Sequence, residues 1–224
     1  MEKLNGISHT IQERLYILLR EDILRGVYPP GAPLNEAELS KRFGISRSPL
    51  RETLSRLTGE GLLKNVPNRG IFVRRFTEKY INDVLNMRDI LERRGVRSFI
   101  PTGERCTELL DMRAEAEKLL KSKPFDVEKH NAFDARMHYM IMGFNDNEYI
   151  DQLAQQIYTL STLFSIQLKT PEGGIESEMQ HIELIDTLLL GDRQTAEKLI
   201  QKHISRTKKL VRAAMKKDGK AAVE

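Results

Sequence analysis

The stretch that decides the fold is Gly44-Ile-Ser-Arg-Ser-Pro-Leu-Arg51, which predicts a tight turn followed by the start of a helix. Gly44 supplies the backbone freedom that a turn needs. Ser46 and Ser48 are residue types that cap helices, and Pro49 is tolerated in a first helical turn. We therefore expect a helix over 50–60, whose apolar side is formed by Leu50, Leu54 and Leu57.

The other side of this helix carries Arg47 and Arg51, which are four residues apart and therefore share an exposed face. Two arginines at the N-terminal end of a short capped helix suit the major groove of DNA, where arginine pairs with guanine or contacts phosphates. We place Ser46 and Ser48 with them in the predicted DNA-contacting set. The alternative is that these are ordinary solvated surface residues.

The flanking residues complete a winged helix-turn-helix. Hydrophobic periodicity predicts a first helix over Thr10–Arg25 and a second over Glu36–Phe43, which a glycine turn joins to the arginine-bearing helix. Two short strand-like runs follow, Leu62–Val66 and Ile71–Val73, separated by a Pro-Asn-Arg-Gly turn. They predict a two-stranded hairpin whose tip carries Arg69. Four independent features coincide: the turn glycine, the capped start of the helix, the paired arginines and the basic hairpin. We therefore favour DNA binding over a purely structural role.

The distribution of charge agrees with this interpretation. The net charge of the chain is +4. Residues 1–75 hold 13 Lys/Arg and 8 Asp/Glu, a net charge of +5, whereas residues 76–224 hold 23 and 24, a net charge of −1. A basic excess that is confined to the first third favours a polyanionic partner for that part alone.

The composition excludes several classes of protein. Hydrophobic residues make up 40% and charged residues 30% of the chain, which indicates a soluble globular protein rather than a disordered one. No apolar run approaches the roughly 18 residues of a membrane span, and the N-terminus lacks the apolar core of a secretion signal, so we expect no membrane partner. The single cysteine, Cys106, excludes an internal disulfide framework and favours a cytoplasmic location.

The remainder of the chain predicts an all-α antiparallel bundle of six helices with short loops. The expected helices are Glu78–Ile100, Glu104–Lys121, Asp126–Phe144, Glu148–Leu168, Ile175–Leu190 and Arg193–Lys216, with a loop at Pro171–Gly174. The predicted fold is therefore mainly α. We expect a winged helix-turn-helix domain over residues 8–75, a helical effector-binding and dimerisation domain over 76–217, and a frayed tail over 218–224.

The predicted bundle contains a set of residues that suit a metal ion. Asp134 and His138 are four residues apart and share a face of the third bundle helix, while His181 and His203 lie on the fifth and sixth. Three imidazoles and a carboxylate make an N3O site for a divalent ion, for which zinc is favoured and manganese or nickel are alternatives. Each residue alone is more often a surface or satisfied polar group. His130 is left outside the set.

Several motifs in the first third resemble the DNA-binding domain of the GntR superfamily of bacterial transcription regulators. They are Leu34-Asn-Glu-Ala-Glu-Leu39, Gly44-Ile-Ser-Arg-Ser-Pro-Leu-Arg-Glu52, Glu60-Gly-Leu62 and Arg69-Gly-Ile-Phe-Val73. The resemblance implies that Arg47 and Arg51 contact bases and phosphates, and that Gly70 lets the wing tip with Arg69 approach the minor groove. Some members carry an arginine where this chain has Ala37, which implies a different operator preference.

The bundle resembles the C-terminal effector domain of FadR-type members, the FCD domain, in its six-helix VanR-like branch. The matching motifs are Phe133-Asp-Ala-Arg-Met-His138, Glu178-Met-Gln-His-Ile-Glu-Leu-Ile185 and His203-Ile204. The resemblance implies that the Asp/His/His/His set binds a divalent metal beside a small organic acid. It also implies that Arg88 faces this effector, although an ordinary surface pair between Arg88 and Glu92 is the alternative.

These observations predict a ligand-responsive transcription regulator. We expect a cytoplasmic homodimer that binds a palindromic operator in double-stranded DNA, acts as a repressor and senses a small-molecule carboxylate. The alternative is a metal-dependent enzyme with a fused DNA-binding head, which would need a general base beyond the four ligands. A third hypothesis, a general architectural DNA binder, predicts neither a metal nor a response to an effector.

Overall fold

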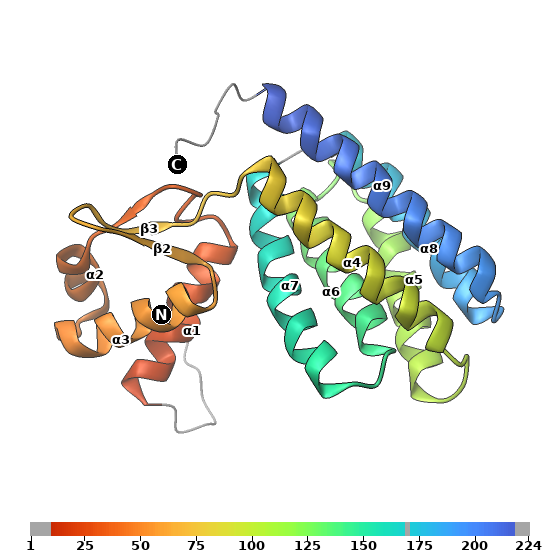
Figure 1. Ribbon diagram of the computed structural model, residues 1–224, viewed down its shortest axis with the longest axis horizontal. Helices are drawn as coiled ribbons and strands as arrows, with labels where there is room; N and C mark the ends of the chain where they lie inside the picture. Colours follow the sequence, from red (N-terminus) through yellow and green to blue (C-terminus); the bar gives the residue numbers. More distant parts are fainter. Residues whose placement is uncertain (1–9, 169–170, 218–224) are drawn as a thin grey trace. The chain divides into compact units, whose positions relative to one another are not determined.

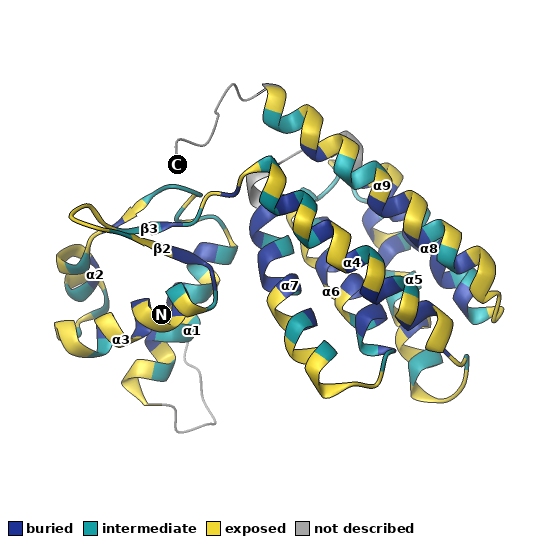
Figure 2. Ribbon diagram, viewed as in Figure 1, coloured by how far each residue is buried: buried dark blue, intermediate teal, exposed yellow. Residues whose placement is uncertain are grey.

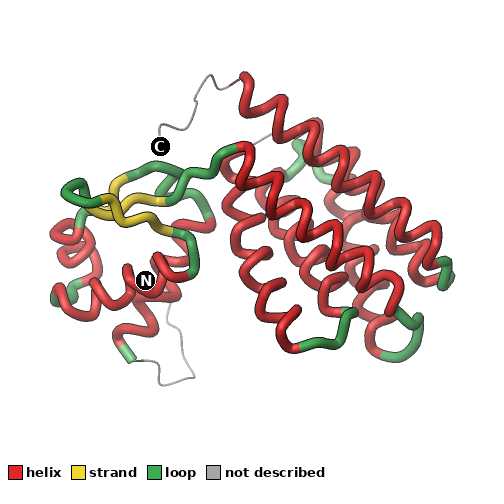
Figure 3. Tube along the Cα trace, in the orientation of Figure 1, coloured by secondary structure: helices red, strands yellow, loops and turns green. Residues whose placement is uncertain are grey.

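The computed structural model describes residues 10–168 and 171–217, so the expected frayed tail, 218–224, lies outside the described residues. The chain divides into two compact units, Met1–Arg75 and Phe76–Glu224. Helices dominate both units, and within the described ranges strands occur in the first unit alone (Figure 3). The chain is therefore mainly α, as the sequence predicts.

The N-terminal unit is a three-helix domain with a small antiparallel sheet (Figure 1). Its elements are α1 (Ile11–Leu24), β1 (Pro33–Leu34), α2 (Glu36–Phe43), α3 (Arg47–Gly59), β2 (Leu63–Val66) and β3 (Gly70–Val73). The strand order is β1-β3-β2, with Pro33 opposite Phe72 and Leu63 opposite Val73. All three helices contribute leucines that are fully or almost fully buried, which gives this unit its own core.

Local capping explains where the first two helices begin and where the second one ends. The side-chain oxygens of Thr10 and Asn35 accept hydrogen bonds from backbone N–H groups in the first turns of α1 and α2. Gly44 ends α2 with a φ of 66°, in the left-handed region that favours glycine, and its N–H donates to the carbonyl of Ser40. The turn that leads into α3 is therefore set by Gly44, as predicted.

Two details of the predicted winged domain were wrong. The third helix begins at Arg47 rather than Leu50, because Ser46 takes the N-cap position and Pro49 fits within the first turn. The hairpin is joined by a third strand, β1, which pairs with β3. Two residues are too few to leave a periodic pattern, so this strand had no signal in the sequence.

The C-terminal unit is a bundle of six helices in the described part of the chain, as predicted (Figure 1). Its elements are α4 (Glu78–Ser98), α5 (Glu104–Lys121), α6 (Val127–Gly143), α7 (Glu148–Leu168), α8 (Pro171–Leu189) and α9 (Arg193–Lys217). The helix α4 packs against α9 and α6, α5 against α8, and α6 against α7. Figure 2 shows that these helices turn buried faces inward and exposed faces outward.

The start of α8 differs from the prediction. Residues 171–174 continue the helix where a loop was expected. Proline suits a first helical position because its missing N–H would have no partner there. A Cβ on Gly174 would lie 2.6 Å from Cε1 of Phe125 and 3.0 Å from Cδ2 of His130. This glycine therefore permits close packing and does not mark a turn.

Ion pairs connect neighbouring helices at the surface of the bundle. Glu197 on α9 accepts hydrogen bonds from Arg93 and Arg97 on α4, with Nε–Oε distances of 2.9 and 2.7 Å. The hydrogen bonds from Arg97 and Arg93 lower the pKa of the Glu197 carboxyl to about 2. Arg113 on α5 pairs with Asp186 on α8 in the same way. No helix in the described ranges is long and apolar enough to cross a bilayer.

Candidate functional site

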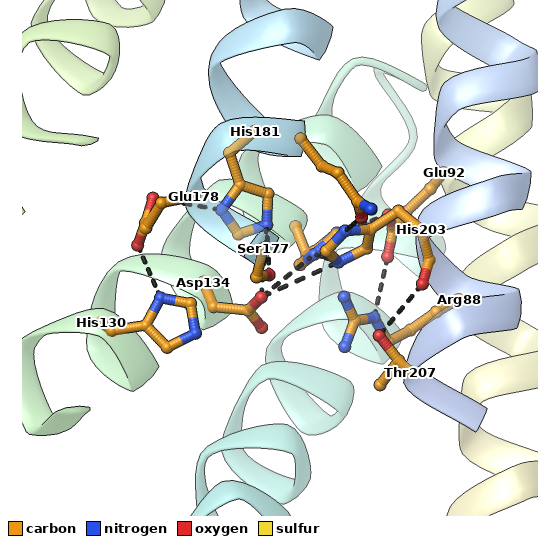
Figure 4. A network of polar contacts seen from close by, with 11 residues as sticks. Arg88, Glu92, His130, Asp134, Ser177, Glu178, His181, His203 and Thr207 are labelled. Carbon is orange, nitrogen blue, oxygen red and sulfur yellow. Dashed lines mark hydrogen bonds and ion pairs between the residues drawn. The ribbon is translucent and has the colours of Figure 1, made fainter. Parts of the chain in front are cut away.

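Four predicted ligands from three helices meet inside the bundle (Figure 4). Asp134 and His138 come from α6, His181 from α8 and His203 from α9. One donor atom from each lies within 4.8 Å of all the others. The three imidazoles are buried, whereas the side chain of Asp134 keeps 25% of its surface exposed and so marks the open side of the site.

Several distances between donor atoms are close to those around a transition-metal ion. Oδ1 of Asp134 lies 3.3 Å from Nε2 of His181 and 3.6 Å from Nε2 of His138, whose Nε2 lies 3.1 Å from Nε2 of His203. A tetrahedron with bonds of about 2.1 Å has edges of about 3.4 Å. An octahedron with the same bonds has edges of about 3.0 Å between adjacent ligands. Oδ1 of Asp134 lies 3.9 Å from Nε2 of His203 and the four donor atoms span up to 4.8 Å, so the side chains would draw closer together to hold a divalent ion with either geometry.

Hydrogen bonds to the outer nitrogens orient all three imidazoles. Nδ1 of His138 donates to Oε2 of Glu92 at 2.6 Å, and Nδ1 of His203 donates to Oε1 of Gln180 at 3.0 Å. Nδ1 of His181 lies 3.3 Å from Oε2 of Glu178. Because these oxygens only accept, the Nδ1 atoms carry protons, so each imidazole could offer its Nε2 lone pair to a cation at the centre once Nε2 is deprotonated. Such outer partners are what metal-binding histidines use.

The electrostatics of the cluster differ from one group to the next. Desolvation lowers the pKa of His181, but hydrogen bonds with Asp134 and Glu178 outweigh it and raise the pKa to about 9. Desolvation and the neighbouring His181 and His138 hold the pKa of His203 well below its usual range. Desolvation raises the pKa of Asp134, but His138 and His181 outweigh it and hold this pKa well below normal. Metal binding would replace a proton with an ion of higher charge.

Sequence reasoning missed two carboxylates that support the site. Glu92 and Glu178 are completely buried, and each holds an imidazole of the cluster. The signal was available, because Glu92 continues the buried stripe of α4 that contains Leu85 and Val96. A charged residue on the buried stripe of an amphipathic helix indicates a buried partner. His130, which was left outside the ligand set, donates from Nδ1 to the other oxygen of Glu178 at 2.6 Å.

Arg88 is buried next to this cluster. Its Nε donates to Oε1 of Glu92 at 2.9 Å, so Glu92 links Arg88 to His138. The positive charge of Arg88 also contributes to the lowered pKa of His203, after desolvation and the charges of the neighbouring histidines. The Arg88–Glu92 pair therefore exists, but inside the bundle and not at its surface.

The other predicted site residues gather at two places in the N-terminal unit. Ser46, Arg47, Ser48 and Arg51 are exposed at the N-terminal end of α3, where Ser46 is the N-cap without a side-chain hydrogen bond. Arg69 and Gly70 are exposed at the tip of the β2–β3 hairpin. Gly70 has a φ of 95°, and Asn68, two residues earlier, has a φ of 60°, which gives the tip its tight turn.

The fold combines a winged helix-turn-helix domain with a helical bundle that contains a cluster of three histidines and one aspartate. Residues 11–73 match the family "Bacterial regulatory proteins, gntR family", and residues 83–206 match the FCD domain. The second match spans more than half of the chain. The chain therefore belongs to the FCD-containing GntR family of transcription regulators, as the motifs predict. The relatives are regulators and not enzymes, so the hypothesis of a metal-dependent enzyme is rejected.

Individual relatives agree with this family assignment over nearly the whole chain. The Nta operon transcriptional regulator of Aminobacter aminovorans is 29% identical, with 84% of this chain and 90% of that protein covered. The transcriptional repressor RspR of Escherichia coli (strain K12) is 24% identical, with 92% of this chain and 90% of that protein covered. A crystal structure of a GntR regulator from Rhodococcus sp. RHA1 has a TM-score of 0.79 and 26% identity, covering 91% and 98%.

Proposed function

We propose that this chain is a repressor that binds an operator as a dimer and releases it when the helical domain binds a metal-supported organic acid. The observation that carries the proposal is the convergence of Asp134, His138, His181 and His203 beside the buried Arg88. GntR-type regulators bind operator DNA, and FCD domains bind small-molecule effectors. A coupling of roughly 1–3 kcal/mol between the two sites would change operator occupancy several-fold to a hundredfold.

The metal would be held by the four converging side chains. Neutral imidazoles and a carboxylate suit zinc, while manganese and nickel accept the same donors. When bound, the ion supplies a positive centre with coordination positions that are left for water or an anion. Asp134, whose side chain is 25% exposed, would place these positions toward the open side of the cluster.

The effector is proposed to be a small carboxylate. Arg88 is cationic and buried, and only its Nε is engaged by Glu92 in a hydrogen bond. A guanidinium has five N–H donors, so those on the two Nη atoms remain for a carboxylate. A small organic acid would thus bridge the metal and Arg88, which explains why the bundle buries an arginine at this position.

On the DNA side, we propose that α3 enters the major groove. Arg47 and Arg51 would contact bases and phosphates, with Ser46 and Ser48 as neutral hydrogen-bonding neighbours. The hairpin tip with Arg69 and Gly70 would approach the minor groove. Support comes from their exposure and from the family to which residues 11–73 belong.

Binding to the DNA upstream of the chain's own coding region tests this function. We expect wild-type protein to retain that duplex against excess unrelated DNA in a fluorescence anisotropy titration. Arg51→Ala should lose about 1–3 kcal/mol of affinity for it, because one arginine contact to a base is removed. Circular dichroism of the variant should match the wild type.

The same titration examines the sensor. With zinc present, one of a panel of small organic acids should weaken operator binding, and Arg88→Ala should abolish that response. Equal retention of upstream and unrelated DNA by the wild type would argue against a sequence-specific regulator. Unchanged binding by Arg51→Ala would remove this residue from the interface.

The dimer is proposed to form through α4. Its solvent-facing stripe places Met87 and Ile90 at 40% and 60% exposure, between the charged residues Asp83 and Arg94. Val84 is only partly buried beside this stripe. Apolar side chains in a rim of charges are typical of an interface, and a second copy is the occupant that a palindromic operator requires.

Ile90→Glu is therefore expected to convert the dimer into a monomer. A buried unpaired carboxylate on each side of a twofold interface would cost several kcal/mol. Light scattering after size-exclusion chromatography measures the mass directly. The matched control is Leu190→Glu, because Leu190 is 84% exposed in the turn between α8 and α9. A dimeric Ile90→Glu variant would place the interface elsewhere.

A further inference from the structure

Glu36 on α2 and Arg51 on α3 form an ion pair within the helix-turn-helix. Oε2 of Glu36 lies 2.8 Å from Nε of Arg51, and the two side chains are 33% and 64% exposed. Exposed pairs of this kind contribute little to the stability of a fold. The main effect of this contact is therefore to orient the guanidinium of Arg51.

The capped start of α2 holds the backbone of Glu36 in a fixed position. Glu36 is the first residue of α2, and the N-cap Asn35 accepts hydrogen bonds from the next two backbone N–H groups. The carboxylate engages Arg51 at Nε alone, and both Nη groups have no hydrogen-bond partner among the described residues. Two parallel N–H donors are what pairing with O6 and N7 of guanine requires. Arg47 differs, because within the described part of the chain its side chain forms no ion pair or hydrogen bond.

We propose that Glu36 is a specificity-determining residue, which orients Arg51 toward a base edge while the unbraced Arg47 contacts phosphates. The proposal rests on the operator-binding function proposed above. A carboxylate near DNA repels the phosphates of every sequence equally. The orientation that it gives to Arg51 is useful only where the matching base is present. Glu36 therefore lowers the affinity for DNA of any sequence and raises the preference for the matching sequence.

Two charge-matched variants test this role. Glu36→Ala and Glu38→Ala each remove one acidic side chain from the first turn of α2, but Glu38 is exposed and has no ion pair with Arg51. The probes are a duplex from the upstream region and a scrambled duplex of equal length and composition. We expect both variants to bind the scrambled duplex more tightly than the wild type. Only Glu36→Ala should lower the ratio of upstream to scrambled affinity, by about tenfold.

A double variant, Glu36→Ala with Arg51→Ala, separates the orienting effect of Glu36 on Arg51 from the effect of its charge. In the Arg51→Ala background, Glu36→Ala should no longer change the affinity ratio, since the residue that it orients is absent. Arg47→Ala should weaken binding to both duplexes equally and reduce the salt slope by about 1.

Three results would overturn the proposal. Equal affinity ratios for Glu36→Ala and Glu38→Ala would make Glu36 an ordinary surface residue. A persistent effect of Glu36→Ala in the Arg51→Ala background would show that it acts through another group. If wild-type protein binds the two duplexes equally, the proposed regulatory function fails and this inference fails with it.

Discussion

Gly95→Ala is expected to destabilise the bundle by about 2 kcal/mol or more and to lower its melting temperature by roughly 5–10 °C. Gly95 is buried on α4, and a Cβ placed there would lie 2.1 Å from the backbone oxygen of Ile141 on α6. Backbone cannot yield as the end of a flexible side chain can, so the two helices must separate. The intrinsic helix preference of alanine offsets only about 1 kcal/mol. Thermal unfolding followed by circular dichroism measures the effect.

The same substitution should also weaken the proposed metal site. Glu92 on α4 holds His138 on α6 across this interface at 2.6 Å, and Asn145 donates to the carbonyl of Leu91 at 2.9 Å nearby. Moving α4 outward lengthens both contacts. We therefore expect Gly95→Ala to bind zinc less tightly than the wild type in a titration with a competing chelator.

Gly143→Ala is the matched control for this prediction. Gly143 ends α6, and a Cβ there would have no atom within 4 Å. Its replacement should leave the melting temperature unchanged or slightly raised, because alanine loses less conformational entropy on folding. If the two variants melt alike, close packing of α4 on α6 does not depend on Gly95.

The parts of the fold that could be predicted are those with a local physical cause. The cap at Asn35, the turn at Gly44 and the periodic apolar stripes leave marks in the sequence, and the second helix was predicted with its correct bounds. The strand β1 could not be predicted, because its two residues pair with β3 only after the chain has folded. Gly174 was wrongly predicted to mark a loop. A glycine is needed there because the ring of Phe125, which is distant in sequence, packs against it.

The candidate site divides in the same way. Asp134 and His138 were paired by their spacing on one helix, but joining them to His181 and His203 required the bundle to be guessed first. The supporting role of Glu178 depends on its two oxygens facing different helices, one toward His130 and one toward His181. No spacing rule contains that geometry. The ion pair between Glu36 and Arg51 likewise depends on the angle between two helices.

The second large effect is expected from His203→Asn. At a zinc concentration of 100 times the Kd, a protein whose native state alone binds the ion gains about 2.7 kcal/mol of stability. For the wild type this corresponds to a rise in melting temperature of roughly 5–10 °C, which a chelator should reverse. His203→Asn should lose this response, because Nε2 of His203 is one of the four converging donors. Elemental analysis of protein purified without chelator identifies the ion.

His130→Asn is the control that separates ligands from their supports. His130 is buried in the same polar network but contacts Glu178 and not the donor atoms of the cluster. It should therefore keep a clear zinc response, reduced in affinity and not abolished. The structure also offers an alternative to a metal, because Nε2 of His138 and Nε2 of His203 lie 3.1 Å apart and could share a proton. If zinc leaves the wild type unchanged while His203→Asn melts lower, then a proton shared between these imidazoles, and no metal, closes the cluster.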